Sequence, residues 1–171
     1  MVKLLFDTRI KRIVAAAFLA SVSSLVFIAS EVNIGLSTSS AAEDTGFLNN
    51  FYALVNDTNR VSQNYDEEFG KWKKGEIGDD QIVRITDSYL PQYDQLIAEA
   101  SSLNTPEKFQ NALDLYIKSL NSERESNAIF SKFITTGDES LNETSRNLLD
   151  EAYKYESDSF ASIIAANNTT N

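Results

Sequence analysis

Apolar residues recur every three or four positions along four stretches of the chain after residue 43. This spacing places them on one face of an α-helix. On the first stretch they are Phe47, Phe51, Leu54, Val61, Tyr65 and Trp72. The links between the stretches are short, which forces neighbouring helices to run antiparallel. The pattern therefore predicts an all-α fold, an up-down-up-down antiparallel four-helix bundle, with helices at about 44–74, 79–103, 105–136 and 138–166.

The apolar face of the fourth stretch fits two architectures. Its stripe consists of Leu141, Leu148, Ala152, Tyr155 and Ile163. A bundle and a long coiled coil produce the same kind of stripe, so a coiled-coil dimer is the alternative. The short links, together with a proline inside the second stretch, favour the closed monomeric bundle.

Local signals mark the boundary residues of the third helix. Thr105 followed by Pro106 predicts a capping threonine and a proline at the first helical position. At the other end, Gly137 is expected to end the helix and Asp138 to cap the next one.

Residues 1–42 follow a different pattern. Four basic residues precede an uncharged apolar run at 13–30; they are Lys3, Arg9, Lys11 and Arg12. A basic flank before such a run is typical of membrane targeting. The run has a length between that of a signal peptide and that of a spanning helix, and small residues at 37–42 offer a cleavage site. We expect an N-terminal targeting segment, cleaved as a signal peptide or retained as a transmembrane helix. The four-helix bundle at 43–171 is then secreted or held on the extracytoplasmic side of the cell membrane.

The composition limits the kinds of catalytic, metal-binding and nucleic-acid-binding function that the protein can have. The chain has no Cys and no His, and its formal charge is −10. Disulfides, thiolate or histidine catalysis and the usual zinc sites are therefore excluded, and the charge has the wrong sign for nucleic acid. Asp57, Asn59 and Glu68 have the spacing of EF-hand ligands, but Ser62 stands where that loop requires glycine. We expect no catalytic residue, no metal and no cofactor.

A break in the third apolar stripe gives the candidate binding site. Three residues replace leucine or phenylalanine there: Glu123, Arg124 and Asn127. In an antiparallel bundle this level meets Thr58, Tyr89, Pro91 and Ala152, where a small residue and a proline kink would open a polar cavity. The ligand-binding candidates are Tyr89, Glu123, Arg124 and Asn127. In the alternative interpretation, Glu123 and Arg124 extend to solvent and Asn127 sets helix register. The core aromatics Tyr65, Trp72, Tyr89 and Tyr93 are expected to pack with their polar ends at the rim.

The expected function is that of an extracytoplasmic, membrane-anchored or secreted helical-bundle binding or sensory module without catalytic activity. Its partner is an unknown protein or small-molecule ligand, with membrane contact through the N-terminal helix if that helix is uncleaved. The layout resembles in architecture the ligand-binding bundles of bacterial and archaeal chemoreceptors and histidine kinases, although no second membrane span or signalling domain follows in the sequence. The alternative is a structural or accessory subunit of a membrane or cell-envelope complex.

Overall fold

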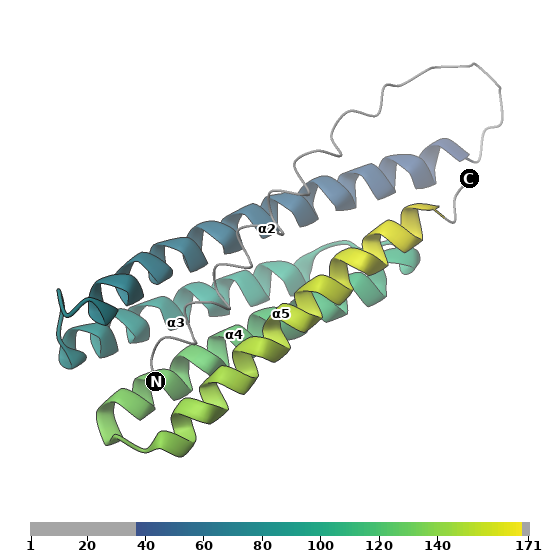
Figure 1. Ribbon diagram of the computed structural model, residues 1–171. Coiled ribbons are helices and arrows are strands. Elements are labelled where there is room, and N and C mark those ends of the chain that lie inside the picture. The colour runs from purple at the N-terminus through teal and green to yellow at the C-terminus, as the bar shows by residue number, and fades with distance from the viewer. Residues whose placement is uncertain (1–36, 169–171) are drawn as a thin grey trace.

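The computed structural model describes residues 37–168, which form an all-helical bundle (Figure 1). Its elements are the helices α2 (Ser37–Lys73), α3 (Asp79–Ser102), α4 (Gln110–Thr136) and α5 (Glu139–Asn168), with a 3₁₀ turn η1 (Glu107–Phe109) before α4. The prediction of an all-helical bundle is confirmed. The expected targeting helix at 13–30 lies outside the described residues. Within residues 37–168, none of the helices combines the length and the hydropathy needed to span a bilayer.

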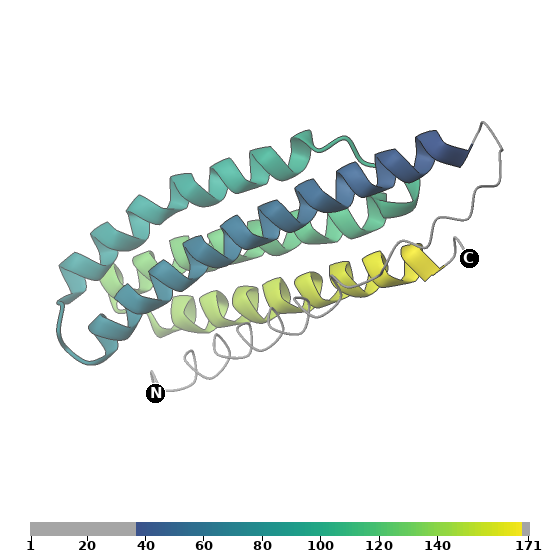
Figure 2. The same ribbon diagram turned by 90° about the horizontal axis from the view of Figure 1, so that it is seen from above.

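Successive helices run in opposite directions. Figure 2 shows α2 in front of α4, with α3 on one side of it and α5 on the other. The start of α2 and the end of α5 lie at the same end of the bundle, together with the α3–α4 link (Figure 1). The α2–α3 hairpin and the α4–α5 turn lie at the opposite end. At that end the Trp72 Nε1–H donates to Asp79 Oδ1 over 2.7 Å and joins the two arms of the hairpin.

The glycine turn between α4 and α5 is built as the sequence predicts. Gly137 has a φ of 70°, a left-handed conformation that glycine adopts without a Cβ penalty, and its N–H donates to the Phe133 carbonyl over 2.8 Å. Asp138 Oδ1 then accepts from the Ser140 backbone N–H and hydroxyl, at 2.9 and 2.7 Å. The Ser140 hydroxyl first, and its N–H second, lower the pKa of Asp138. The turn therefore ends one helix and caps the next.

The predicted start of the third helix is wrong in detail. Thr105 caps nothing: its hydroxyl donates to the carbonyl of Leu103 over 3.0 Å. Pro106 has an extended ψ of 143°, so it precedes the helical residues, and α4 begins at Gln110 after η1. The Thr-Pro pair thus redirects the chain ahead of η1, and no side chain caps the start of that turn.

Two other helices also differ from expectation. The structure begins α2 at Ser37, earlier than the expected boundary near 44. Phe47 is the first of its apolar residues to be buried. α3 continues as one helix through Pro91, and the Pro91 side chain is exposed to solvent.

The buried apolar residues form two separate clusters. The larger cluster lies toward the end of the bundle that holds the start of α2, and it includes Phe47, Phe51, Tyr93, Phe109, Tyr116, Leu120 and Ile163. The smaller cluster consists of Phe69, Ile82, Phe130 and Leu149, with partly buried neighbours such as Trp72 and Ile85. Along α4, the buried Glu123 and Asn127 stand between Leu120 of the first cluster and Phe130 of the second. The core is therefore interrupted by polar side chains at mid-height.

The α4–α5 interface is lined by small residues spaced seven apart. They are Ala112, Ser119 and Ser126 on α4 and Ser145, Ala152 and Ser159 on α5, all of them buried. Each serine hydroxyl donates to a carbonyl of the other helix. The bonds are Ser119 to Ala152 at 2.8 Å, Ser126 to Ser145 at 2.7 Å, Ser145 to Ser126 at 2.9 Å and Ser159 to Ala112 at 2.7 Å. Side chain-to-backbone bonds between helices require the two backbones to approach closely, which small side chains permit.

The predicted apolar stripe of the fourth helix is accordingly wrong for three of its five residues, whereas Ala152 and Ile163 are buried as predicted. Leu141, Leu148 and Tyr155 are only partly buried. The buried face of α5 includes Asn142, Ser145, Leu149, Ala152, Glu156, Ser159 and Ile163. Close packing of small polar residues, rather than burial of the largest apolar ones, determines which side of α5 faces α4.

A buried polar cluster around Glu123

Three helices each supply one residue to a polar cluster at the mid-height of the bundle. We define the polar cluster as Ser62 of α2, Tyr93 of α3 and Glu123 of α4. Glu123 Oε1 accepts from the Ser62 hydroxyl at 3.0 Å and from the Tyr93 hydroxyl at 2.9 Å. The two hydroxyl oxygens lie 3.2 Å apart. One carboxylate oxygen therefore links α4 to both α2 and α3.

All three side chains are sealed from solvent. Glu123 is 2% exposed, Ser62 3% and Tyr93 0%. Removing a carboxylate from water costs several kcal/mol unless hydrogen bonds compensate. The two hydroxyls supply part of that compensation by donating to one oxygen of the Glu123 carboxyl group. The polar cluster is thus an ordered connection between helices and not a solvated pocket.

A second hydroxyl pair lies toward the smaller cluster. The Tyr65 and Thr86 hydroxyls are 2.9 Å apart, and Thr86 Oγ1 is also 2.8 Å from the Ile82 carbonyl. A threonine hydroxyl has one proton, and the carbonyl can only accept it. Tyr65 therefore donates to Thr86, and Thr86 donates to Ile82. This chain adds a second polar link between α2 and α3 next to the polar cluster.

The four predicted site residues separate into two environments. Glu123 and Asn127 turn into the centre of the bundle, and both are buried. Arg124 turns toward α3, where Nε and Nη2 donate to the two carboxylate oxygens of Asp94 at 2.5 and 3.2 Å. This hydrogen bond, ahead of the charge itself, raises the pKa of Arg124. The interpretation in which Glu123 extends to solvent is wrong, because its position continues the inward stripe from Leu120.

Tyr89 lies beside the site and not within the polar cluster. Its ring is partly buried, with its centroid 5.3 Å from that of Tyr65. Burial raises the pKa of the Tyr89 hydroxyl, and the charges of Glu68 and Glu67 add to that effect. Tyr89 thus packs beside Tyr65, whose hydroxyl bonds to Thr86, and lies near the carboxylates of Glu67 and Glu68.

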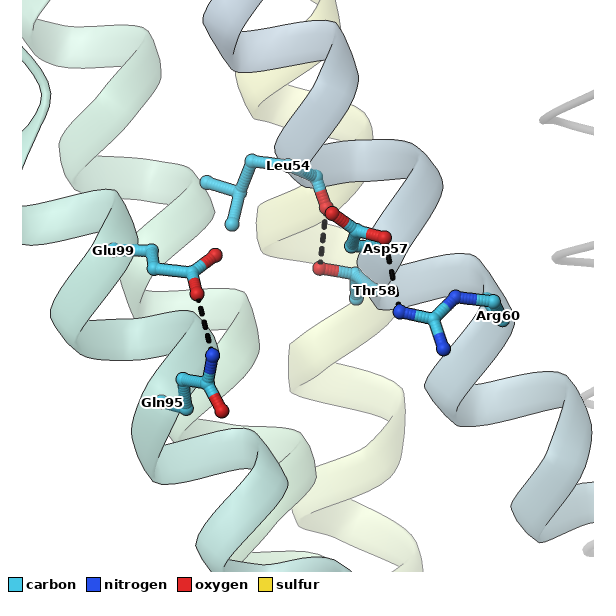
Figure 3. Close-up of polar contacts among 6 residues, drawn as sticks. All are labelled: Leu54, Asp57, Thr58, Arg60, Gln95 and Glu99. Carbon is cyan, nitrogen blue, oxygen red and sulfur yellow. Dashed lines mark hydrogen bonds and ion pairs between the residues drawn. The ribbon is translucent and has the colours of Figure 1, made fainter.

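Thr58, which sequence reasoning placed at the same level, contributes to its own helix. Its buried hydroxyl donates to the Leu54 carbonyl over 3.0 Å (Figure 3). The exposed neighbours Asp57 and Arg60 form an ion pair of 3.0 Å along α2. The internal bond means that Thr58 supports α2 without linking it to α3.

Sequence reasoning missed the two hydroxyl donors of the polar cluster. Ser62 was not singled out, and Tyr93 was expected to direct its hydroxyl to the rim, whereas it is fully buried. Tyr65 departs from the same expectation. A signal was present: Thr58, Ser62 and Tyr65 repeat with helical spacing on the inner face of α2, and each carries a hydroxyl. Hydroxyls repeated on a core face predict partners across the bundle.

The polar cluster places a serine hydroxyl beside a carboxylate, as a nucleophile and its base would be placed. Burial of all three residues keeps a substrate away from that pair in this conformation. Among residues 37–168, no group of three or more acidic side chains has the geometry to hold a metal ion. In the packing seen here, the arrangement links three helices to one another through hydrogen bonds. No family model, curated protein or solved structure gives a significant match to the chain.

Proposed function

We propose that this protein is a non-catalytic helical-bundle binding or sensory module that works outside the cytoplasm. Residues 1–42, with their basic flank and apolar run, either anchor it in the membrane or are removed on export. The bundle binds a partner on its surface. The up-down-up-down layout fits that role, because it joins a binding surface along the helices to the end of the bundle where the N-terminal segment enters.

The polar cluster is the observation that carries this proposal. An apolar core of leucine and phenylalanine at its positions would be simpler and more stable, since replacing buried polar groups by apolar ones is often stabilising. Sequences depart from uniform core packing where a site or a second conformation requires it. A bundle that divides its apolar core with Glu123 is therefore better suited to changing its helix packing than to acting as an inert spacer.

Surface charge supports a cationic partner. After residue 42 the chain has 11 Lys and Arg residues against 23 Asp and Glu residues. Clusters of one sign attract ligands of the other and raise their association rate. The partner class we propose is thus a cationic peptide or small cationic molecule.

The alternative, a permanent accessory subunit, has less support. Permanent subunit interfaces are more apolar than the rest of a protein surface. Among the described residues the exposed large apolar side chain is Ile164, at 56%. A transient, polar partner fits this surface better.

Export is tested by the amino terminus and location of the native protein. We expect the full chain to fractionate with membrane or to appear in the medium with residues 43–171 accessible to protease from outside. Mass spectrometry then distinguishes a retained Met1 from a new terminus near Ala42. Full-length protein in the cytosol would refute export.

Partner binding is tested by thermal unfolding of the full chain with spermidine or a lysine-rich peptide. We expect the melting temperature to rise with either probe in low salt, and to rise less at 0.15 M salt because of screening. No shift with either probe, together with stable recovery in a large complex, would favour the accessory-subunit alternative.

A further inference from the structure

The helices of this bundle are joined in two different ways. α5 is fastened to α4 by four serine-to-carbonyl hydrogen bonds along the interface. α2 meets α4 and the η1 turn before it mainly through ring contacts: Phe51 with Tyr116 and Phe69 with Phe130 on α4, and Phe47 with Phe109 of η1, at 5.1, 5.3 and 5.0 Å between centroids. One ion pair, Asp44 with Lys108, joins α2 to η1. Ring contacts are favourable over a broad range of geometries, whereas a hydrogen bond to a carbonyl tolerates little displacement.

α3 belongs with the α4–α5 pair. The Arg124–Asp94 ion pair and the Ser131 hydroxyl, which donates to Asp87 Oδ1 over 2.9 Å, join α4 to α3 at two levels. The Tyr93–Glu123 bond adds a third level between them. α3, α4 and α5 are thus held together by directional contacts along their length.

We propose that α3, α4 and α5 form a rigid frame, that α2 is the displaceable helix, and that the Ser62 hydroxyl is the latch that holds α2 in the position seen here. Ser62 is the α2 member of the polar cluster and contacts both Tyr93 and Glu123. Release of this contact leaves Tyr93 and Glu123 still bonded to each other, so the frame survives. α2 then loses its mid-height contact and stays joined to α3 through Tyr65 and Thr86, nearer the hairpin. This inference rests on the proposed sensory function and supplies its moving part.

The position of α2 in the chain makes its displacement consequential. α2 is the first helix after the apolar run at 13–30, and its first residues precede the buried part of the helix that begins at Phe47. In the anchored form of the protein, a shift of α2 against the frame would therefore act on the chain that leads to this apolar run.

Hydrogen exchange on the free full-length protein tests the latch. We expect the backbone amides of α2 between residues 51 and 69 to exchange at least tenfold faster than those in the centres of α4 and α5, because α2 opens without unfolding the frame. Exchange at one common rate in all four helices would overturn the division into frame and displaceable helix.

Ser62→Ala and Tyr93→Phe separate the latch from general stability. Ser62→Ala should speed α2 exchange at least threefold and leave α4 and α5 unchanged. The exposed Ser157→Ala serves as its matched control and should change neither. Tyr93→Phe removes the Ser62–Tyr93 contact together with the Tyr93–Glu123 bond of the frame, so it should speed exchange in α3 as well as in α2. Equal acceleration in α2, α4 and α5 by both variants would show that the polar cluster stabilises one cooperative unit, which overturns the latch.

The outcome is independent of export and of any ligand, because exchange is measured on the free protein. A cytosolic location would refute the proposed function and leave the latch standing. A uniform exchange rate would refute the latch and leave export and binding standing.

Discussion

The interface between α4 and α5 and the interface between α2 and α4 solve the same packing problem with opposite residues. Ser119 and Leu120 are neighbours in the chain, yet Ser119 bonds to the α5 backbone while Leu120 belongs to the larger apolar cluster with Phe51. Small residues bring the backbones of α4 and α5 together and let side chains reach carbonyls. Large rings hold α2 and α4 further apart and fill the space between them. One helix can therefore present a directional interface and an adaptable one on two of its sides.

The largest expected effect comes from charging the adaptable side. Leu120 is 0% exposed, so Leu120→Asp buries an unpaired carboxylate in the larger cluster and should cost about 4 kcal/mol of unfolding free energy. Urea unfolding measures it. Asn121→Asp adds the same charge at the next, exposed position and should change stability by less than about 0.5 kcal/mol. A loss below about 1 kcal/mol for Leu120→Asp would mean that the stripe faces elsewhere.

Overfilling the directional side should have the next largest effect. Ser119→Leu places a large side chain where the hydroxyl lies 2.8 Å from the Ala152 carbonyl, so α4 and α5 must separate, at a cost of about 3 kcal/mol. Lys118→Leu, at the exposed neighbouring position, is the control and should be close to neutral. If both variants have the same stability, the close approach of the two helices is not required.

Removing hydroxyls without changing size sharpens the comparison. The double variant Ser126→Ala with Ser145→Ala deletes two reciprocal bonds, of 2.7 and 2.9 Å, and should lose about 2 kcal/mol in total, near 1 kcal/mol for each bond. The loss is read from the denaturation midpoint at unchanged slope. A stability equal to that of the parent would assign the α4–α5 interface to packing alone.

The smallest effect concerns the turn that joins the α4–α5 pair. The pKa of Asp138 is lowered below its ordinary value of 3.8 by the Ser140 hydroxyl and N–H. The folded pKa lies below the unfolded one, so this cap stabilises the protein above about pH 4 and loses its effect as the pH falls through the folded pKa. Asp138→Ala should therefore be less stable than the parent at pH 7, and the difference should narrow below pH 4 in urea titrations. The exposed Asp150→Ala controls for loss of charge, and a difference that persists at low pH would contradict the assignment.

The sequence predicts the adaptable part of the fold well and the directional part poorly. Phe51, Leu113 and Leu120 are large and apolar with helical spacing, and all three are buried. On α5, selecting large apolar residues with helical spacing favours Leu148 and Tyr155 over Ser145 and Ser159. A hydrophobicity pattern does not show that a serine is buried because it bonds a carbonyl of the neighbouring helix. A seven-residue repeat of small residues is visible in the sequence, but its meaning depends on the partner helix lying opposite in matching register.

The candidate site divides in the same way. The interrupted stripe correctly singles out Glu123 and Asn127 as residues at core positions. It does not reveal that Arg124 pairs with Asp94, or that Ser62 and Tyr93 donate to Glu123. These contacts join residues on different helices, 30 to 61 positions apart in the chain. The direction in which a side chain points and the residue that it contacts depend on the assembled bundle. Neither can be read from the sequence of one helix.

The regular spacing of the small residues on α4 and α5 has a mechanical consequence. The carbonyls and hydroxyls meet at Ala112 with Ser159, Ser119 with Ala152 and Ser126 with Ser145, so each step of seven residues along α4 matches a step of seven back along α5. Sliding one helix by a single residue, about 1.5 Å, would break every one of these bonds, and comparable contacts recur only after about 10.5 Å. The two helices are thus held in one register. Any motion between them must proceed in whole steps, whereas the ring contacts of α2 permit a graded shift.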